Sequence, residues 1–564
     1  MKNYTITDRS VLLDLDKLYC NNESQVLNSK AFYDMVVRFL KYLKKQDKIY
    51  YRAFRNIDAH TIVRFYKDLF VWNYQDVSQQ FKDIPFLEDR IFMYRFTENF
   101  YEFWRRFERY AIFKYHTGYS NTTSAIALIE DSMHFESLIL RLYRSFAQKI
   151  IYRSFPVYRQ LSSGVSATLL IRPNNFTHKN FYPKLNKYQF IQSSLLNTPI
   201  MLYSHANIRT GVYREVFENP LDTLKINSDY FTYAIWVVNL LAYVYFHKSL
   251  MGHGISLGNL FEPARHEQYT GKKPDLICVF GAKDERFDGT YYKDTKNNLY
   301  IGTVSLNPKN DYFGYLKKMI LTLHNLYMID EGSLPIHGAM VQITFNNGKR
   351  KNVVIMGDSG AGKSETLEAL RNIDADIDHM RIVYDDMGVF KFKDDKLISH
   401  GTETGAFVRL DDLEAGYAYQ NLDRSIFLNP NKTNARVILP VTYYDFIIAD
   451  HEIDLCLYAN NYEDPKESIR LFNNVNVAIE VFTRGTRRAK GTTNEVGITE
   501  TFFANPFGPL QRKEHCGKLI HDYFNHMFNK HIPIGEIYTR LSIDGMREKG
   551  PRMAAESLLK LLKE

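Results

Sequence analysis

One segment of this 564-residue sequence, Gly357-Asp-Ser-Gly-Ala-Gly-Lys-Ser364, constrains the possible folds more than any other. It matches G-x-x-x-x-G-K-[ST], the pattern of a loop that holds nucleotide phosphates between a strand and a helix. The apolar run 352–356 before the loop predicts the strand, and residues 365–371 after it predict the helix. A chance glycine turn would rarely combine all these parts in this order. The sequence therefore predicts a P-loop within an α/β fold.

The residue types of this loop suit the binding of a triphosphate and its metal ion. Its glycines let several backbone N–H groups point at phosphate oxygens, and the following helix adds its positive end. We expect Lys363 to reach the β- and γ-phosphates and the Ser364 hydroxyl to hold Mg²⁺. The predicted nucleotide-binding residues of the loop are Gly357, Asp358, Ser359, Gly360, Ala361, Gly362, Lys363 and Ser364.

Two acidic residues follow a second apolar strand downstream of the loop. The run Arg-Ile-Val-Tyr ends in Asp385 and Asp386. Acids placed after a strand beside a P-loop usually hold the metal ion, directly or through water. The alternative is a solvated turn. We expect Asp385 to act with the nucleotide's Mg²⁺.

Changes in composition and hydrophobic periodicity along the sequence predict three domains, at 1–200, 201–335 and 336–564. The length exceeds what one hydrophobic core supports. The first region is mainly helical, since Asp34–Asp47 and Ser132–Ile151 carry apolar residues at helical spacing. The second alternates short apolar runs with Gly, Pro, Asn and Asp, which predicts a mixed α/β domain. The third is the P-loop domain.

Strands dominate the predicted P-loop domain. Asn346-Asn347-Gly348 between two apolar runs predicts a hairpin. We expect further short strands in RIVYDD, in ARVILPVTYYDFIIAD (435–450) and in NVAIEVF (476–482), and an amphipathic helix from Gly550 to the end.

Composition places few limits on function. The net charge is +8, from 72 basic and 64 acidic residues, which suits anionic metabolites as well as nucleic acid. The scattered cysteines form no CxxC pair, so no disulfide framework or zinc site is expected. The N-terminus does not read as a signal peptide and no run reaches the length of a membrane span, so we expect a cytoplasmic protein without a membrane partner.

Aromatic residues make up an unusual 15% of the chain and interleave with basic ones in the segment 51–70. This pattern is compatible with an RNA-binding surface. Acids such as Asp58 and Asp68 interrupt the basic residues, however, and the apolar residues recur at helical spacing. We therefore expect an amphipathic helix whose basic stems cover the edge of a core, and no nucleic-acid partner.

Further segments resemble the phosphoenolpyruvate carboxykinase family, in its order, over about residues 300–564. Tyr312-Phe-Gly314, the pair Lys317-Lys318, an apolar helix and Leu334-Pro-Ile-His337 precede the P-loop. The later segments that match the family are Asn431-Lys-Thr-Asn-Ala-Arg436, Arg488-Ala-Lys-Gly491, Thr499-Glu500, Phe507-Gly508 and Thr539-Arg540-Leu-Ser-Ile543.

The resemblance implies an ATP-dependent enzyme that decarboxylates oxaloacetate and phosphorylates the enolate, giving phosphoenolpyruvate, CO₂ and ADP. By family position, Lys318, His337 and Asp386 would bind a catalytic Mn²⁺. A lysine can do so only when neutral. ATP and Mg²⁺ would occupy the P-loop, with Arg540 and Leu541 at the adenine and a lid over about 484–497. The residues placed at the transferring phosphoryl group and substrate are Lys317, Lys363, Arg436, Tyr312 and Gly314.

The sequence also departs from the family. The P-loop itself is more similar to that of HPr kinase/phosphorylase, and Arg409 stands where the family carries a phosphate-bridging lysine. The substrate-carboxylate arginine cannot be aligned, and Arg209 and Arg214 are the candidates. Residues 1–200 do not resemble the family. Two alternatives follow: a kinase for a protein or small molecule on the same core, and a non-catalytic nucleotide sensor.

Overall fold

The structure, a computed structural model, is mixed α/β and divides into two compact units. The first unit comprises 1–172 and 191–200, and the second comprises 173–190 and 201–564. The division therefore falls near the predicted boundary at 200, and it does not separate 201–335 from 336–564. The described residues are 4–14, 20–46, 57–114, 121–152, 161–173, 182, 185, 189–224, 226–358, 360–371, 373, 376–410, 422–489 and 497–563.

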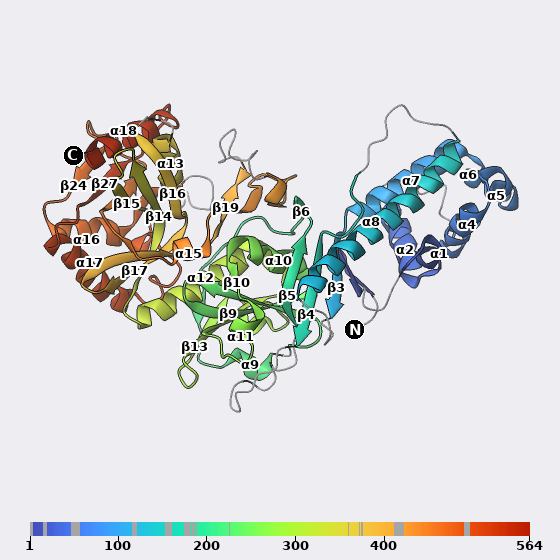
Figure 1. Ribbon diagram of the computed structural model, residues 1–564, viewed down its shortest axis with the longest axis horizontal. Coiled ribbons are helices and arrows are strands. Elements are labelled where there is room, and N and C mark those ends of the chain that lie inside the picture. The colour runs from blue at the N-terminus through green and yellow to red at the C-terminus, as the bar shows by residue number, and fades with distance from the viewer. Residues whose placement is uncertain are drawn as a thin grey trace. The chain divides into compact units, whose positions relative to one another are not determined.

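The first unit combines helices with the strands β1 to β5 (Figure 1). These strands follow the order β1-β2-β3-β4-β5, with β2, β3 and β4 parallel. Its strands are β1 Tyr4–Ile6, β2 Ser10–Asp14, β3 Glu108–Lys114, β4 Ala167–Pro173 and β5 Gln189–Leu196. Its helices are α1 Glu23–Asn28, α2 Lys30–Gln46, α4 Ala59–Val71, α5 Tyr74–Gln80, α6 Pro85–Glu88, α7 Arg90–Arg105 and α8 Asn121–Ile151.

Helical periodicity accounts for these helices and for the core between them. The helices expected at 34–47 and 132–151 are confirmed over 34–46 within α2 and over 132–151 within α8, and residues 59–70 of the aromatic-basic segment belong to α4. Asp47 lies outside the described residues. Residues 51–56 of that segment lie outside the described part. Asp58 caps α4 by accepting a hydrogen bond from the Thr61 N–H at 2.8 Å. Phe39, fully buried, contacts the rings of Phe96 and Phe103, so the aromatic residues of this region build its core.

The second unit contains strands in the order β8-β9-β11-β13-β12-β7, with β10 beside β8. The apolar stretch 231–246 forms the β8–β9 hairpin of this sheet. Helix α12, Phe313–Asp330, packs on β11 and β13 and also contacts β14 of the P-loop sheet. The strands are β7 Arg214–Glu215, β8 Tyr230–Val237, β9 Leu240–His247, β10 Glu262–Pro263, β11 Leu276–Ala282, β12 Thr290–Asp294 and β13 Leu299–Ser305. The short helices are α9 Pro220–Thr223, α10 Met251–Leu260 and α11 His266–Tyr269.

A second large sheet carries the P-loop, in the order β22-β18-β17-β14-β15-β23-β27-β24, with β16 also paired to β14. The expected Asn-Asn-Gly hairpin is confirmed between β14 and β15, and β15, β23 and β27 run parallel. The strands are β14 Leu334–Phe345, β15 Arg350–Met356, β16 Ile377–Tyr384, β17 Met387–Lys393, β18 Lys396–Gly401, β22 His451–Glu452, β23 Leu455–Asn460, β24 Ile469–Leu471 and β27 Ile534–Tyr538.

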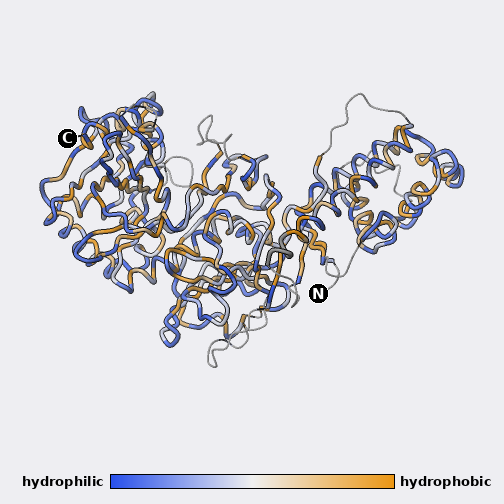
Figure 2. The backbone as a smooth tube through the Cα atoms, viewed as in Figure 1, coloured by the Kyte–Doolittle hydropathy of each residue, from blue (hydrophilic) through white to orange (hydrophobic). Residues whose placement is uncertain are grey.

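Helices cover both faces of the P-loop sheet. Successive side chains of a strand point to opposite faces. Val354 and Met356 of β15 therefore join one core with Phe524, while Val353 and Ile355 join another with Leu558. Figure 2 shows the hydrophobic colour following such strands. The helices are α13 Lys363–Arg371, α15 Tyr444–Ile447, α16 Val475–Arg484, α17 Lys513–Asn529 and α18 Lys549–Lys563.

Two smaller sheets complete the described strands. One contains β6 Ile200–Leu202, β19 Gly405–Arg409, β20 Ile426–Leu428 and β21 Arg436–Pro440. The other pairs β25 Thr486–Arg488 with β26 Ile498–Glu500.

Two strand predictions were wrong in this region. Residues 476–482 belong to helix α16, because Ala478, Ile479 and Phe482 recur at helical spacing and face the core. The Asn474 side chain caps the helix by accepting from the Asn476 N–H. The stretch 435–450 is a strand only to Pro440, where β21 ends, and it then forms the short helix α15.

The chain contains no candidate membrane-spanning helix among the residues that the structure describes.

We predict that the Leu138→Ala variant lowers the free energy of unfolding of the first unit by about 2–5 kcal/mol, because Leu138 is fully buried and truncation leaves a cavity. Ile129→Ala is the matched control on the same helix, since Ile129 is 44% exposed and should change stability by about 0.5 kcal/mol or less. Hydrogen exchange of α8 peptides measures both changes. Equal effects of the two variants would contradict the assignment of the core face.

Candidate active site

The P-loop motif lies where the sequence predicts it, between β15 and α13. Gly357, Gly360 and Gly362 all have positive φ, at 153°, 79° and 92°. A side chain at Gly362 would bring a Cβ within 2.5 Å of the Thr539 Oγ1 atom. The Thr539 hydroxyl donates to the Ala361 carbonyl at 2.7 Å, so the end of β27 supports the loop. Ser359 lies outside the described residues.

The two groups expected to meet Mg²⁺ face one another. The Ser364 hydroxyl donates to Asp385 Oδ1 at 3.0 Å, and burial raises the pKa of Asp385 to about 6. Lys363 Nζ, which is buried, donates to the Asp358 carbonyl of its own loop at 3.1 Å. Ser364 and Asp385 thus supply adjacent oxygen atoms, the ligand type that Mg²⁺ prefers.

Lys318, His337 and Asp386 come together from three different elements. Lys318 Nζ, on α12, donates to Asp386 Oδ2 at 2.7 Å. His337 Nε2, on β14, lies 3.0 Å from Asp386 Oδ1. The His337 Nδ1 atom donates to the Ala504 carbonyl at 2.7 Å, which fixes the ring and directs Nε2 at the carboxylate. The structure therefore gathers the three predicted metal ligands at one point.

Buried charges set the protonation states of this cluster. Lys317 Nζ is almost fully buried and contacts both Asp386 Oδ2 at 2.7 Å and Glu403 Oε1 at 2.9 Å. Although burial opposes its charge, these carboxylates raise the pKa of Lys317. Burial and the adjacent Lys317 charge lower the pKa of Lys318 despite the pull of Asp386. Against burial, the two lysines and His337 hold the pKa of Asp386 well below its usual value.

This arrangement fits a divalent cation in one respect. The lowered pKa of Lys318 makes a neutral amine, the form that can be a ligand, more accessible there than at an ordinary lysine. No group of three or more His, Cys, Asp or Glu side chains is placed to hold a metal ion in the described ranges, so a cation at this point depends on the lysine as its third ligand.

Backbone hydrogen bonds join the predicted metal ligands to the P-loop motif. The Gly357 N–H donates to the His337 carbonyl, and the Gly338 N–H donates to the Asp386 carbonyl, each at 3.0 Å. Strand β14 therefore holds the first residue of the P-loop and the second acid of the Asp-Asp pair at fixed positions beside His337.

Positively charged residues of the neighbouring small sheet extend the site. Arg409 of β19 and Arg436 of β21 are Cα partners in the antiparallel ladder. The ring of Phe407, which sequence reasoning did not single out, lies 5.5 Å from the Arg436 guanidinium and 5.8 Å from Lys317 Nζ. Tyr312 is buried with its ring 5.8 Å from that of Phe407.

The structure separates the two arginine candidates for the substrate. The Arg209 guanidinium lies 4.8 Å from the centroid of the Phe507 ring, and Lys318 Nζ lies 4.7 Å from the same centroid. Arg214 is exposed on β7, where its guanidinium donates to the Arg286 carbonyl. At Gly314 an added Cβ would come within 2.5 Å of the Tyr312 ring, so glycine permits this packing.

The segment expected at the adenine has a supporting role within the protein. The Arg540 guanidinium is fully buried and donates to Asp464 Oδ1 at 2.5 Å, Ser468 Oγ at 2.9 Å and the Pro465 carbonyl at 2.6 Å. These bonds hold the loop after β23 against β27. Leu541 beside it is buried.

Two charged residues of the site were not predicted from the sequence. Glu403, buried beside Lys317, lies in the segment that drew attention only through Arg409. Arg487 on β25 is also buried, and its Nε donates to the P-loop carboxylate Asp358 Oδ2 at 2.9 Å. This ion pair joins the loop to the base of the expected lid, of which residues 490–496 lie outside the described part. Neither residue matches a motif, so only the fold reveals them.

Comparison with known proteins adds no relative, because no family model and no curated protein matches this sequence.

We predict that Lys317→Met lowers the free energy of unfolding by about 3–5 kcal/mol, because it removes a buried cation from between the carboxylates of Asp386 and Glu403. Adding Glu403→Gln to this variant should restore part of the loss, since one uncompensated charge disappears. The control Lys309→Met breaks an ion pair with Asp288 whose lysine is 63% exposed, and should cost about 1 kcal/mol or less. Denaturant titration measures all three. A loss no larger than the control's would contradict the buried network.

Proposed function

We propose that this protein is an ATP-dependent phosphoenolpyruvate carboxykinase, with oxaloacetate as substrate. The observation that carries the proposal is the meeting of Lys318, His337 and Asp386 within hydrogen-bonding distance, next to a P-loop. The reaction breaks the carbon–carbon bond to the leaving carboxylate, which departs as CO₂. Its electron pair forms the enolate of pyruvate. The enolate oxygen then bonds to the γ-phosphorus of ATP as the bond to the β-phosphate oxygen breaks, giving ADP.

The charges of the site support this chemistry. A Mn²⁺ ion held by Lys318, His337 and Asp386 would supply a Lewis acid for the negative charge that develops on the substrate oxygen. Asp386 is ionised, and the lowered pKa of Lys318 makes its neutral form more accessible than at an ordinary lysine. Lys317, by contrast, keeps its proton because the carboxylates of Asp386 and Glu403 raise its pKa. It would remain a fixed positive charge beside the transferring phosphoryl group.

The phosphate side of the site would hold ATP with Mg²⁺. Lys363 neutralises the β- and γ-phosphates, while Ser364 and Asp385 offer oxygen ligands to Mg²⁺. Arg436 and Arg409 lie opposite each other on β21 and β19, so they can contact the phosphoryl group from the small sheet. The catalytic assignments are therefore Lys317, Lys363, Arg409 and Arg436.

Arg209 is the stronger candidate for anchoring the substrate carboxylate. It shares the Phe507 ring with Lys318, which places a guanidinium near the proposed Mn²⁺ ligand. Arginine binds carboxylates through two parallel hydrogen bonds. Arg214 lacks this proximity, since its contact is with the Arg286 carbonyl.

The alternative with specific support is a kinase of the HPr kinase type. Asp358, within the P-loop, is buried with its Oδ1 atom 3.6 Å from His337 Nδ1. A carboxylate there could accept a proton from a hydroxyl acceptor. Oxaloacetate-dependent release of CO₂ and ADP favours the carboxykinase, whereas ATP consumption that requires a hydroxyl-bearing acceptor favours the kinase.

We predict that Lys363→Ala lowers the rate of oxaloacetate-dependent ADP formation by about 10²- to 10³-fold, because it removes a charge at the phosphates. Lys351→Ala is the matched control. Lys351 lies on β15, the strand before the loop, and pairs with Asp454, so its loss should leave the rate nearly unchanged. A coupled assay of ADP release measures both. Wild-type activity in Lys363→Ala would refute the P-loop assignment.

We predict that the protein binds Mn²⁺ without nucleotide and that His337→Asn weakens this binding by about tenfold or more, because one nitrogen ligand is lost. The control His379→Asn alters a half-exposed histidine of β16 and should bind Mn²⁺ as the wild type does. The electron paramagnetic resonance signal of free Mn²⁺ measures binding directly. Equal affinity of the two variants would exclude His337 as a ligand.

A further inference from the structure

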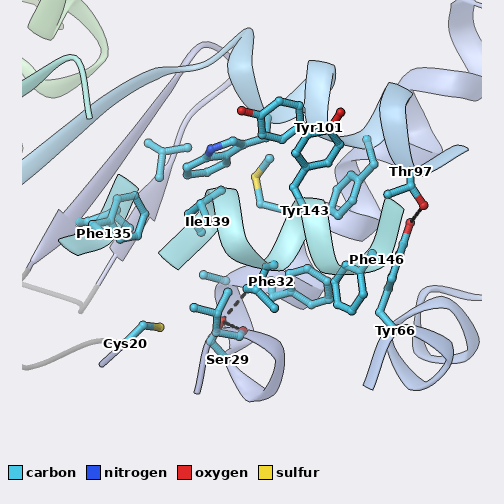
Figure 3. A pocket seen from close by; sticks show the side chains of 18 of the residues that line it. Cys20, Ser29, Phe32, Tyr66, Thr97, Tyr101, Phe135, Ile139, Tyr143 and Phe146 are labelled. Carbon is cyan, nitrogen blue, oxygen red and sulfur yellow. Dashed lines mark hydrogen bonds between the residues drawn. The ribbon is translucent and has the colours of Figure 1, made fainter. Parts of the chain in front are cut away.

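The first unit contains a partly open apolar cavity of about 120 Å³ between its helices and the strands β1 and β2. Figure 3 shows aromatic side chains from several elements around it. Tyr101 of α7 and Tyr143 of α8 are stacked, with ring centroids 3.9 Å apart. The other large rings of the wall are Phe32, Tyr66, Phe100, Trp104, Phe135 and Phe146.

The polar groups on this wall are already bonded within the fold. Tyr101 donates its hydroxyl to the Leu161 carbonyl at 2.6 Å, and Tyr143 donates to Glu98 Oε1 at 2.6 Å. Trp104 Nε1 donates to the Ser163 carbonyl at 3.0 Å. The Tyr66 and Thr97 hydroxyls bond to each other at 3.0 Å. These five wall residues therefore leave a ligand little beyond apolar contact.

The cavity wall is also uncharged and held in place. Burial raises the pKa of the Cys20 thiol to about 11, so this wall residue stays neutral. The hydrogen bonds made by the polar groups of Tyr101, Trp104 and Tyr143 also fix their rings against neighbouring segments of the protein. Side chains anchored at their polar ends cannot easily collapse into the space. A water molecule would need two to four polar partners, which this wall does not supply.

We propose that the cavity is a binding site for one small, neutral, single-ring aromatic molecule. An apolar protein cavity of about 150 Å³ stays dry and takes up benzene, so a space of this size and polarity accepts a ligand of that class. Edge and face contacts with the surrounding rings favour an aromatic ligand over an alkyl chain. A fatty acid is a poorer match, because its carboxylate requires polar partners that the wall has committed elsewhere.

This site is independent of the proposed enzymatic function. Its lining residues all belong to the first unit, and none is among the residues assigned to ATP or substrate. Binding to the folded protein alone should stabilise that unit as the ligand concentration rises above its dissociation constant.

Titration of the full-length protein with benzene tests the proposal, with binding followed by ligand-observed NMR and by hydrogen exchange of α8 peptides. We expect saturable binding of one molecule per chain and slower exchange in α8. Hexanoate, which has a charged head, should show no saturable binding. Absence of saturable benzene binding by the wild-type protein, or equal binding of hexanoate, would overturn the proposal.

The variant Ile139→Trp tests whether benzene binds in this cavity, because Ile139 lines the cavity and the larger tryptophan ring would occupy it. We expect its affinity for benzene to fall by about tenfold or more. Ile129→Trp is the matched control on the same helix, at a position 44% exposed, and should bind as the wild type does. Equal loss or equal retention in both variants would show that benzene binds elsewhere. If Ile139→Trp does not fold, Leu142→Phe, at another wall residue of α8, replaces it in the same comparison.

Discussion

The carboxylate of Asp386 is the interaction on which the candidate active site depends. It meets Lys317, Lys318 and His337; Lys317 is buried, and Lys318, the next residue of α12, has a side chain that is 15% exposed. Burying cations costs free energy unless an opposite charge lies close by. Asp386, with Glu403, compensates these charges. The two lysines nevertheless differ in their partners. Both contact Asp386, but Lys317 also contacts a second carboxylate, that of Glu403.

The position of Asp386 follows from the pairing of a single strand. Strand β14 pairs with β16 up to Tyr384 and with β17 from Met387, so the two acids lie where the chain passes from one ladder to the other. His337 of β14 lies at that point, and its carbonyl accepts from the first P-loop residue. The proposed metal ligands and the P-loop motif are therefore parts of one backbone arrangement. A shift of β14 by one residue would turn His337 to the other face of the sheet.

The two units use their aromatic residues in different ways. In the first unit, tyrosine and phenylalanine fill the core between helices, and hydrogen bonds from their polar ends hold an apolar cavity open. In the second, Phe407 and Phe507 lie beside cations of the site. A ring face attracts a cation while it excludes water. Aromatic content alone therefore does not distinguish a packed core from a charged site, although the neighbours of each ring do.

The local features could be predicted from the amino-acid sequence: the P-loop motif between its strand and helix, the hairpin before it, the apolar helix after Lys317-Lys318, and the helical stripes of α2 and α8. These depend on spacing over a few residues. Sequence reasoning misjudged 476–482, where a short apolar run satisfies both periods and only the surrounding core selects a helix. It could not find Glu403 or Arg487. Only the tertiary structure decided which charges meet, because a buried ion pair is set by chain segments that are distant in sequence and carries no local pattern.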